Sequence, residues 1–449
     1  MNGRVLMLAM CFACTPDGVS TVRYPVPVAS GWSNPEPAVD TDEDPNRTAI
    51  TLTAAAQTYI IDGEEIEGYA YNGQNPGPTI RLTVGDTLSV TLVNDLDVPT
   101  TIHWHGLSVP YAMDGVTWTN APIGPGESFE YTFTVTQTGT FWYHPHFDTE
   151  RQVDLGLYGL IIVEEEEEPS VDRELNLVMD SWGDYHSDST HQHFGAIRAW
   201  TVNGLKQPDI DVASGDLIRM RILNASNIGY LSLSGSFRVI ASDQGWLSQP
   251  HEGEGTVLGP GDRIEAEWRV GSQQMHLMTY PYAMHGGGAY GVPIALATLS
   301  PIGLASAPPE YSWPQRDGDV SEDPGVTDLV YVFQGDDSSG VWMINGEVFP
   351  DITIHQLPMD TTAIIEVRNM SSVEHPFHLH GFSFEVLSVN GEPSSVLRIE
   401  DTLNLSIRDR VRLKVMVDNP GFWMTHCHIL PHAYGGMMTI IEVPEPSEP

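Results

Sequence analysis

Cysteine is scarce in this sequence. Its 449 residues include three cysteines, Cys11, Cys14 and Cys427, and the first two lie in an apolar N-terminal stretch. Once such a stretch is removed as a leader, one thiol is left, which excludes an intrachain disulfide. A lone thiol in an exported chain indicates a chemical role for Cys427.

The N-terminal stretch has the composition of a secretory signal. Residues 4–14 combine a basic start, an apolar core and a small residue before Cys14. They resemble a bacterial lipoprotein leader cleaved before Cys14, although Cys11 stands where such leaders usually carry Leu; a plain signal peptide is the alternative. We therefore expect residues 1–14 to be a leader and residues 15–45, rich in Pro, Ser, Asp and Glu, to be a flexible tether. The protein is then exported, either secreted or held at the periplasmic membrane or cell surface by a lipid on Cys14.

Basic residues are few. The chain has 20 Lys and Arg against 60 Asp and Glu, a formal net charge of -40, and its only lysines are Lys206 and Lys414. An acidic surface of this kind repels phosphate backbones, so nucleic acid is excluded as a partner. The acidity favours a solvated surface suited to a saline medium; the alternative is attraction of metal cations or cationic substrates.

Apolar residues are distributed in short runs. None of the segments after the leader is long and apolar enough to span a membrane. The hydrophobic content of 41% still supports cores of ordinary size. Residues 87–93 and 129–135 alternate apolar and polar side chains between Gly and Pro turn signals, which predicts an all-β chain.

One pattern occurs three times and predicts three domains. It consists of an Asn-Gly pair, a Pro, an Asp and a second Asn, beginning at Asn72, Asn203 and Asn345. Each repeat is too long for a solenoid unit and suits a Greek-key β-sandwich. The predicted domains are residues 46–168, 169–300 and 326–449, with a linker at 301–325.

Histidines occur in four His-x-His pairs, all in the first and third repeats. The pairs are His103-Trp-His105, His144-Pro-His146, His378-Leu-His380 and His426-Cys-His428. On a strand, residues i and i+2 project from one face about 6–7 Å apart, so each pair can reach two neighbouring metal ions. Neutral imidazole suits copper, zinc, iron or nickel, so the histidines alone leave the metal open.

The thiol selects the metal. Cys427 stands between two histidines, so on a strand its sulfur points to the opposite face. On that side His375 and His432 are available as nitrogen ligands and Met437 as a weak axial sulfur, the donor set of a blue copper site. A structural zinc site would need four firm ligands. Ordinary packing of Met437 and a capped strand end at His375 are the alternatives, but the joint spacing favours copper.

These motifs resemble those of a known family. His103-Trp-His-Gly106, Trp142-Tyr-His-Pro-His146, His375-Pro-Phe-His-Leu-His-Gly381 and His426-Cys-His-Ile-Leu-Pro-His432 through Met437 are similar to the four copper motifs of the three-domain, laccase-like multicopper oxidases. The resemblance implies three consecutive cupredoxin-like domains, a trinuclear cluster between the first and third, and four copper ions. It implies that His375, Cys427, His432 and Met437 hold the type 1 copper, His103 and His378 the type 2, and His105, His144, His146, His380, His426 and His428 the type 3 pair.

The resemblance also implies an activity. It predicts a monomeric oxidase that takes single electrons from phenols or aromatic amines and reduces dioxygen to water, with Cys427 on the electron path. A metallo-oxidase of Cu(I), Fe(II) or Mn(II) is one alternative, and a copper-binding protein without turnover is another. The cuprous oxidases carry an Asp and a Met where this chain has Ser371 and Val373, which weakens a Cu(I) reading that depends on that position.

Two further features have open interpretations. Asp114, eleven residues after His103, matches an acid that the family places near the cluster for proton delivery, and it also opens an Asp-Gly turn. The methionines and histidines between Met275 and His285 suit either a soft-metal entrance or, as we favour, a strand and loop of the second domain. Pro145 within its His pair fixes φ and removes an N–H, which alters the strand without preventing ligation.

Overall fold

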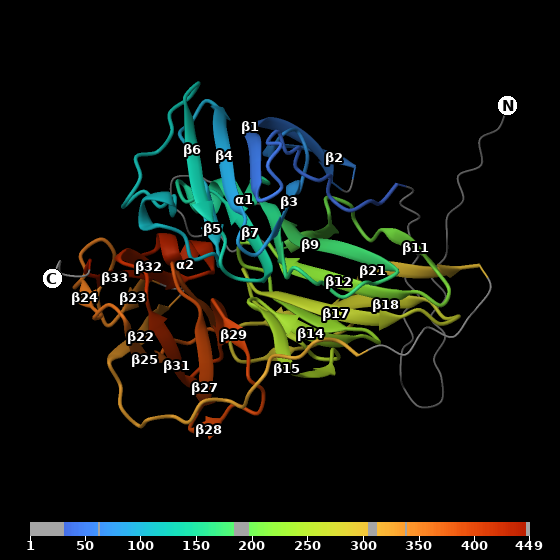
Figure 1. Cartoon of the computed structure of the whole chain (residues 1–449). Helices are drawn as coiled ribbons and strands as arrows, with labels where there is room; N and C mark the ends of the chain where they lie inside the picture. The colour runs from blue at the N-terminus through green and yellow to red at the C-terminus, as the bar shows by residue number, and fades with distance from the viewer. Residues whose placement is uncertain (1–30, 62, 184–196, 304–311, 337–338, 446–449) are drawn as a thin grey trace.

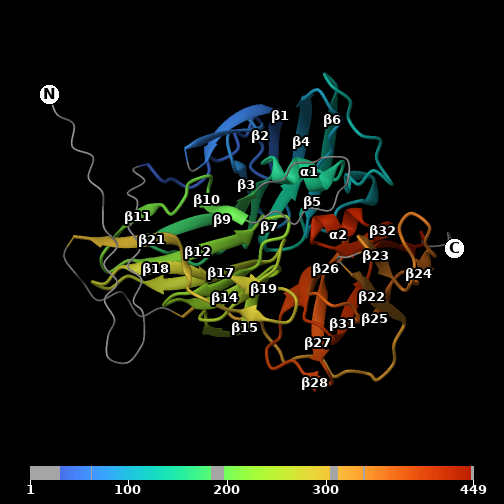
Figure 2. The same cartoon turned by 180° about the vertical axis from the view of Figure 1, so that it is seen from behind.

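The computed structural model describes residues 31–61, 63–183, 197–303, 312–336 and 339–445. Strands dominate these ranges, so the all-β prediction is confirmed. The predicted leader and the first part of the predicted tether lie outside the described residues. Figure 1 shows the first part of the chain, blue to teal, above the third part, orange to red, with the middle part beside both; Figure 2 shows the same arrangement from behind.

The first sandwich consists of two four-stranded sheets. One has the order β2 (Glu64–Tyr71), β1 (Arg47–Ile61), β4 (Thr87–Asp95) and β6 (Ser128–Thr134), and the other β3 (Gly77–Thr83), β8 (Gly159–Glu164), β7 (Gly139–His144) and β5 (His103–His105). Strands β4 and β6 coincide with the two alternating runs noted in the sequence, and their apolar residues face the core between the sheets.

The middle sandwich is built from a six-stranded and a five-stranded sheet. The six strands are β10 (Ile197–Val202), β9 (Arg173–Gly183), β12 (Leu217–Asn224), β17 (Arg263–Arg269), β14 (Arg238–Ser242) and β15 (Gly245–Glu252). The five are β11 (Asp209–Ala213), β21 (Ile294–Ile302), β18 (Met275–Tyr280), β13 (Leu231–Ser234) and β16 (Val257–Leu258), and a small hairpin joins β19 (Tyr282–Ala283) to β20 (Gly288–Ala289). Strand β21 extends past residue 300, into the range predicted as a linker.

The third sandwich has the same two-sheet plan. The larger sheet has the order β23 (Val341–Ile344), β22 (Leu329–Asp336), β25 (Thr361–Asn369), β31 (Arg410–Val417), β27 (Phe384–Val389) and β28 (Glu392–Pro393), with β29 (Ile399–Glu400) also paired to β27. The smaller has the order β24 (His355–Gln356), β33 (Met438–Val443), β32 (Gly421–Cys427), β26 (His375–Leu379) and β30 (Thr402–Leu405).

The repeated Asn-Gly pairs have one conformation in all three sandwiches. The Asn φ angles are 53° at Asn72, 52° at Asn203 and 57° at Asn345, and each following Gly is also at positive φ. Each Asn side chain bonds the strand that opens its sandwich: Asn72 donates to the Thr51 carbonyl at 3.0 Å and accepts from the Thr53 N–H at 2.7 Å. The other two make the equivalent pair of bonds. The sequence repeat is therefore a structural repeat.

Three short helices accompany the strands in the described residues. They are η1 (Tyr111–Met113), α1 (Thr149–Asp154) and α2 (Leu430–Tyr434). Helix α1 follows the His144–His146 pair and α2 follows the His426–His428 pair, and the two helices pack together through a cluster that includes Val153 and Leu430. They join the first sandwich to the third beside the predicted ligands. None of these helices has the length and apolar character needed to cross a membrane.

The predicted flexible tether, 15–45, is wrong in its described part. The Asn34 side chain donates to the Glu174 carbonyl at 3.0 Å and accepts from the Asn176 N–H at 2.8 Å. These bonds hold the segment against strand β9 of the middle sandwich, because they satisfy backbone groups that the edge of the strand would otherwise leave to solvent.

A buried carboxyl links the first two sandwiches. Tyr158 donates a hydrogen bond to Asp180 Oδ2 at 2.6 Å, and the Ser181 N–H donates to Oδ1 at 2.7 Å. Burial raises the pKa of Asp180 to about 7, because its effect exceeds that of the two hydrogen bonds, which lower the pKa. Asp180 is therefore protonated in the folded chain at pH values where it is ionised in the unfolded chain.

This raised pKa predicts a pH dependence of stability. The stabilisation by protonated Asp180 is complete below the unfolded pKa and is lost as the pH rises toward the folded pKa, with a slope of at most about 1.4 kcal/mol per pH unit. We expect Asp180→Asn to flatten the fall in the free energy of unfolding between about pH 4 and pH 7, measured by urea denaturation. Asp211→Asn on an exposed position of β11 is the control. Parallel curves for wild type and Asp180→Asn would contradict the assignment.

Candidate metal centre

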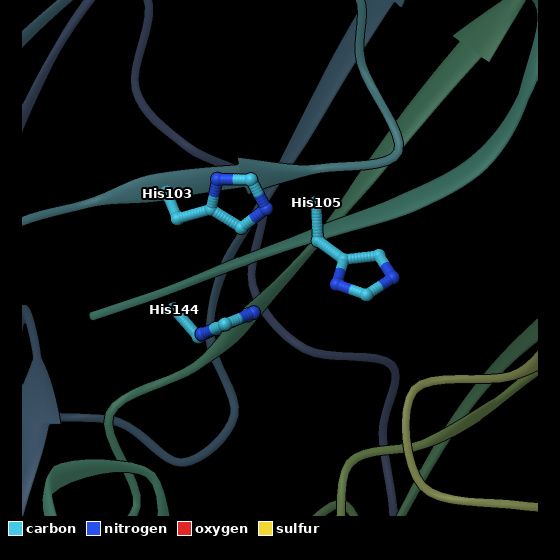
Figure 3. A group of neighbouring side chains, drawn as sticks. All are labelled: His103, His105 and His144. Carbon is cyan, nitrogen blue, oxygen red and sulfur yellow. The ribbon is translucent and has the colours of Figure 1, made fainter. Parts of the chain in front are cut away.

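The pairing of β5 with β7 brings the first two His pairs together. His103 lies directly opposite His144 in this antiparallel register, so their side chains project from the same face. Ligand nitrogens of His103, His105 and His144 all lie within 4.8 Å of one another. Figure 3 shows these side chains gathered in one space, two from β5 and one from the end of β7. Strand β7 ends at His144, where Pro145 follows.

The pairing of β26 with β32 does the same for the other two pairs. His378 lies opposite His426, and Phe377 lies opposite Cys427. His426 Nε2 lies 3.0 Å from His380 Nε2, whereas Cys427 faces the core of the third sandwich. Alternation along β32 therefore points the thiol away from its neighbouring histidines, as predicted.

The two sets of histidines meet between the first and third sandwiches. The His105 ring stacks on His378 with centroids 3.8 Å apart, and His103 stacks on His380 at 3.9 Å. All eight histidines of the four predicted pairs are in this group, and each is at least nine-tenths buried: His103, His105, His144, His146, His378, His380, His426 and His428. We call it the eight-histidine group.

Several inward nitrogens of this group have no hydrogen-bond partner among the described residues. They include Nε2 of His103, His144, His146 and His378, and Nδ1 of His105. Buried polar atoms are rarely left unpaired, so this set of lone pairs around one space fits bound metal ions.

The outward nitrogens do have partners, which orient the rings. Nδ1 of His103 donates to the Asp114 carbonyl at 3.0 Å, and Nδ1 of His378 donates to the Asp401 carbonyl at 3.0 Å. The His105 ring has the opposite orientation: its Nε2 contacts Thr402 Oγ1 at 2.9 Å, and its Nδ1 is the nitrogen without a partner among the described residues. A ring that donates through one nitrogen offers the lone pair of the other to a metal, so these bonds fix which atom faces the shared space.

Cys427 is the centre of a second donor group. Its Sγ lies 3.4 Å from His375 Nδ1 and 3.7 Å from His432 Nδ1, and all three residues are fully buried. Met437 is buried in the same core cluster, and its carbonyl accepts from the Cys427 N–H at 3.1 Å. One thiol and two imidazoles with a nearby Met match the predicted blue copper donor set.

Two neighbours of this second group were not found from the sequence. The Trp342 ring stacks on His432 with centroids 3.8 Å apart, and Ser371 Oγ contacts His375 Nε2 at 2.7 Å. Ser371 stands where the cuprous oxidases have Asp, and here it turns His375 Nδ1 toward the sulfur. Trp342 comes from β23 in the other sheet, so no local spacing could have indicated it.

Burial sets the protonation of both groups. It lowers the pKa of His375 to about 3 and that of His426 to about 4. It also lowers the pKa of His105, His144 and His378 far below the usual range, and neighbouring imidazoles lower these further. Burial raises the pKa of the Cys427 thiol. The imidazoles are thus neutral and ready to bind metal, whereas the thiol must release its proton to do so.

Asp114 lies at the C-terminal end of η1, beside the eight-histidine group. It precedes Gly115, which has a φ of 75°, and its side chain is 1% exposed. Besides holding His103 through its carbonyl, it accepts a hydrogen bond from His380 Nδ1 on Oδ2 at 3.0 Å. The turn therefore presents the acid to histidines of two sandwiches.

The segment from Met275 to His285 divides into two parts. Met275 is buried in the core of the middle sandwich, as the structural interpretation holds. Met284 instead packs against the core of the third sandwich, and its carbonyl accepts from the Glu374 N–H at 2.9 Å. A charge on the exposed His285 would lower the pKa of His432, so this end of the segment lies near the thiol group.

Comparisons with known proteins agree with this geometry. Two family models, both described as multicopper oxidase, match residues 53–168 and 321–447. The chain is 31% identical to a multicopper oxidase of Staphylococcus aureus, with 88% of each chain covered. It is 28% identical to the multicopper oxidase MmcO of Mycobacterium tuberculosis, covering 93% of this chain and 92% of the relative.

Solved structures give the same result. A multicopper oxidase from Campylobacter jejuni, described as a metallo-oxidase, superposes with a TM-score of 0.81 at 25% identity, covering 94% of this chain and 96% of that one. A laccase-like multicopper oxidase from Ochrobactrum sp., described as having oxidase activity towards lignin model compounds, gives 0.78 at 25% identity, covering 93% and 100%.

Proposed function

Because this chain belongs to the multicopper oxidase family, it is a copper-dependent oxidoreductase that uses dioxygen, and we propose that its two donor groups hold the family's four copper ions. Its three sandwiches have the cupredoxin-like fold of that family. The proposed type 1 ligands are His375, Cys427, His432 and Met437; the type 2 ligands are His103 and His378; the type 3 ligands are His105, His144, His146, His380, His426 and His428. The observation that carries this proposal is the set of inward, unpartnered nitrogens in the eight-histidine group.

The chain itself connects the two groups. When bound, the four copper ions supply the storage and transfer of the four electrons that dioxygen needs to become water. Cys427 is joined by peptide bonds to His426 and His428, so one short stretch of backbone links the thiol group to the eight-histidine group. Full burial of the histidines keeps bulk water out and limits the escape of partly reduced oxygen.

We propose phenols or aromatic amines as the electron donors. Tyr434, two residues after His432 in helix α2, is 53% exposed, and the buried Trp342 ring stacks on His432. Aromatic side chains next to a ligand suit a planar aromatic donor. The oxidation of lignin model compounds described for the Ochrobactrum relative supports the same class.

Oxidation of a metal ion is the second candidate. It is favoured by the position of Met284 and His285 beside the third sandwich near His432, since thioether and imidazole bind soft cations. The net charge of -40 attracts cations, and the Campylobacter relative is described as a metallo-oxidase.

Copper loading tests the proposal. The purified chain should take up about four copper ions and develop a blue thiolate band, and Cys427→Ser should lose that band and about one copper. Oxygen uptake should follow addition of a phenol, whereas Cu(I), Fe(II) and Mn(II) serve as the competing donors. The variant should consume oxygen no faster than copper-free protein, because the donor-side ligand is missing.

Each result has a distinct meaning. Full copper without oxygen uptake from any donor would leave a copper-binding protein and refute the oxidase. Uptake with a metal ion but with none of the phenols or amines would replace the first donor class by the second. Retained oxidation in Cys427→Ser would refute the electron path.

Asp114 is proposed to deliver protons to the cluster space. Its carboxylate contacts His380 and its carbonyl holds His103, so Asp114→Asn keeps the shape and the carbonyl contact while removing the acid. We expect oxygen reduction to slow about 100-fold, the usual contribution of general acid catalysis, while a donor still bleaches the blue band at the wild-type rate. Stopped-flow measurement of both rates decides this; equal slowing of both would instead indicate a structural defect.

Export is proposed from the composition of residues 1–14 alone. The intact mass of protein recovered from producing cells should correspond to a chain beginning at Cys14 and carrying lipid. A mass that retains residues 1–13 would contradict the leader.

A further inference from the structure

The middle sandwich contributes a side chain to the surroundings of the cluster, although none of its described residues belongs to a donor group. Arg263, the first residue of β17, donates to Asp401 Oδ1 at 2.7 Å and to Oδ2 at 2.5 Å. Asp401 belongs to the third sandwich. Arg263 also donates through Nε to the carbonyl of Thr140 in the first sandwich at 2.8 Å. This guanidinium therefore bonds to all three sandwiches at their junction.

Asp401, the acid that pairs with Arg263, contacts the eight-histidine group directly. Asp401 Oδ1 lies 3.1 Å from Nε2 of His105, and the Asp401 carbonyl accepts from Nδ1 of His378 at 3.0 Å. Between them, Thr402 Oγ1 donates to Asp401 Oδ1 at 3.0 Å and contacts His105 Nε2 at 2.9 Å. One dipeptide thus orients two stacked imidazoles that come from different sandwiches.

The ion pair between Arg263 and Asp401 lies in a buried region that contains several other acids. Asp401 is 0% exposed and Arg263 1% exposed, and the further acids Asp243, Asp262 and Glu400 are buried around them. Burial raises the pKa of these three acids, which limits their negative charge. A bidentate guanidinium is the partner that can keep a fully buried carboxylate in a fixed orientation.

The neighbouring backbone is shaped to admit the pair. Gly106 follows the first ligand motif at a φ of 88°, and a Cβ there would lie 2.5 Å from Asp401 Oδ2 and 2.8 Å from Arg263 Nη2. Gln244 of the middle sandwich donates to both the Gly106 carbonyl at 2.8 Å and Asp401 Oδ2 at 2.7 Å. The glycine of the His-Trp-His-Gly motif is therefore favoured for two reasons. Its positive φ suits glycine, and a side chain at this position would clash with the ion pair.

We propose that Arg263 is a positioning residue of the copper cluster. Through Asp401 and Thr402 it holds His105 and His378 in register, so that the middle sandwich, none of whose described residues is a proposed ligand, fixes the orientation of ligands in the other two. This role rests on the proposed function of the eight-histidine group. It assigns the outer bonds of one type 3 ligand and one type 2 ligand to a single interdomain contact.

Arg263→Lys tests the role, because lysine keeps the positive charge but cannot form the bidentate bond. The matched control is Arg219→Lys, since Arg219 is also a buried arginine of the middle sandwich, paired with Glu265 and Glu168. Both variants are loaded with copper, and the loss of copper to a chelator is followed together with the type 2 electron paramagnetic resonance spectrum and the blue band. Melting temperatures of both variants report any general loss of stability.

We expect Arg263→Lys to lose cluster copper about 10-fold to 100-fold faster than Arg219→Lys, the usual effect of removing a group that orients a metal ligand. Its type 2 spectrum should change while the blue band stays unaltered. Asp401→Asn, which keeps the His378 contact through its carbonyl, should produce the same change in the spectrum.

Three outcomes would overturn the role. If Arg263→Lys and Arg219→Lys lose copper at the same rate and have the same type 2 spectrum, Arg263 does not position the ligands, whereas the proposed function stands. Equal loss of the blue band and the cluster signals in Arg263→Lys would show a collapse of the whole chain rather than a local effect. A wild-type chain that holds no cluster copper refutes the proposed function, and this role with it.

Discussion

Eight buried imidazoles packed between the first and third sandwiches are the constraint on which the rest of this structure depends. Several of their inward nitrogens have no partner among the described residues. Burial lowers the pKa of His144 and His378 far below the usual range, so these rings are neutral. Such a cluster costs free energy unless metal ions complete it. Each of the three sandwiches has its own extensive hydrophobic core, and this burial of apolar surface opposes that cost.

The strand registers follow from this constraint. In β5–β7 and β26–β32 a histidine lies directly opposite a histidine, which places two ligands on one face without any long loop. The same alternation places Cys427 on the other face of β32, inside the core of the third sandwich. Cys427 is therefore adjacent in the chain to two residues of the eight-histidine group, His426 and His428, so the thiol group and the eight-histidine group are held together by one strand.

The middle sandwich supports the eight-histidine group, although none of its described residues belongs to a donor group. It brings a buried arginine to the junction of the three sandwiches, where the guanidinium forms an ion pair with Asp401 beside His105 and His378. It also places Met284 against the third sandwich near the thiol group. The middle sandwich therefore contributes residues to the surroundings of both the eight-histidine group and the thiol group.

The sequence by itself determined the all-β class, the three repeats and the candidate donors, because these depend on local periodicity. Alternation along a strand fixes which side chains share a face, so the opposite orientations of Cys427 and His426 followed from their adjacency. The predicted tether failed for a related reason: its composition indicated flexibility, but the side chain of Asn34 finds backbone partners in β9 that no local pattern reveals.

Tertiary structure alone decided the partners of the ligands. Trp342, Asp401 and Arg263 act through contacts between different sheets or sandwiches. Asp114 could be separated from an ordinary turn residue only by its contact with His380. Such contacts depend on how whole sheets pack, which sequence spacing does not encode. Local repetition could therefore identify the residues that offer lone pairs, whereas the packing of three sandwiches decided which nitrogen of each ring faces the shared space.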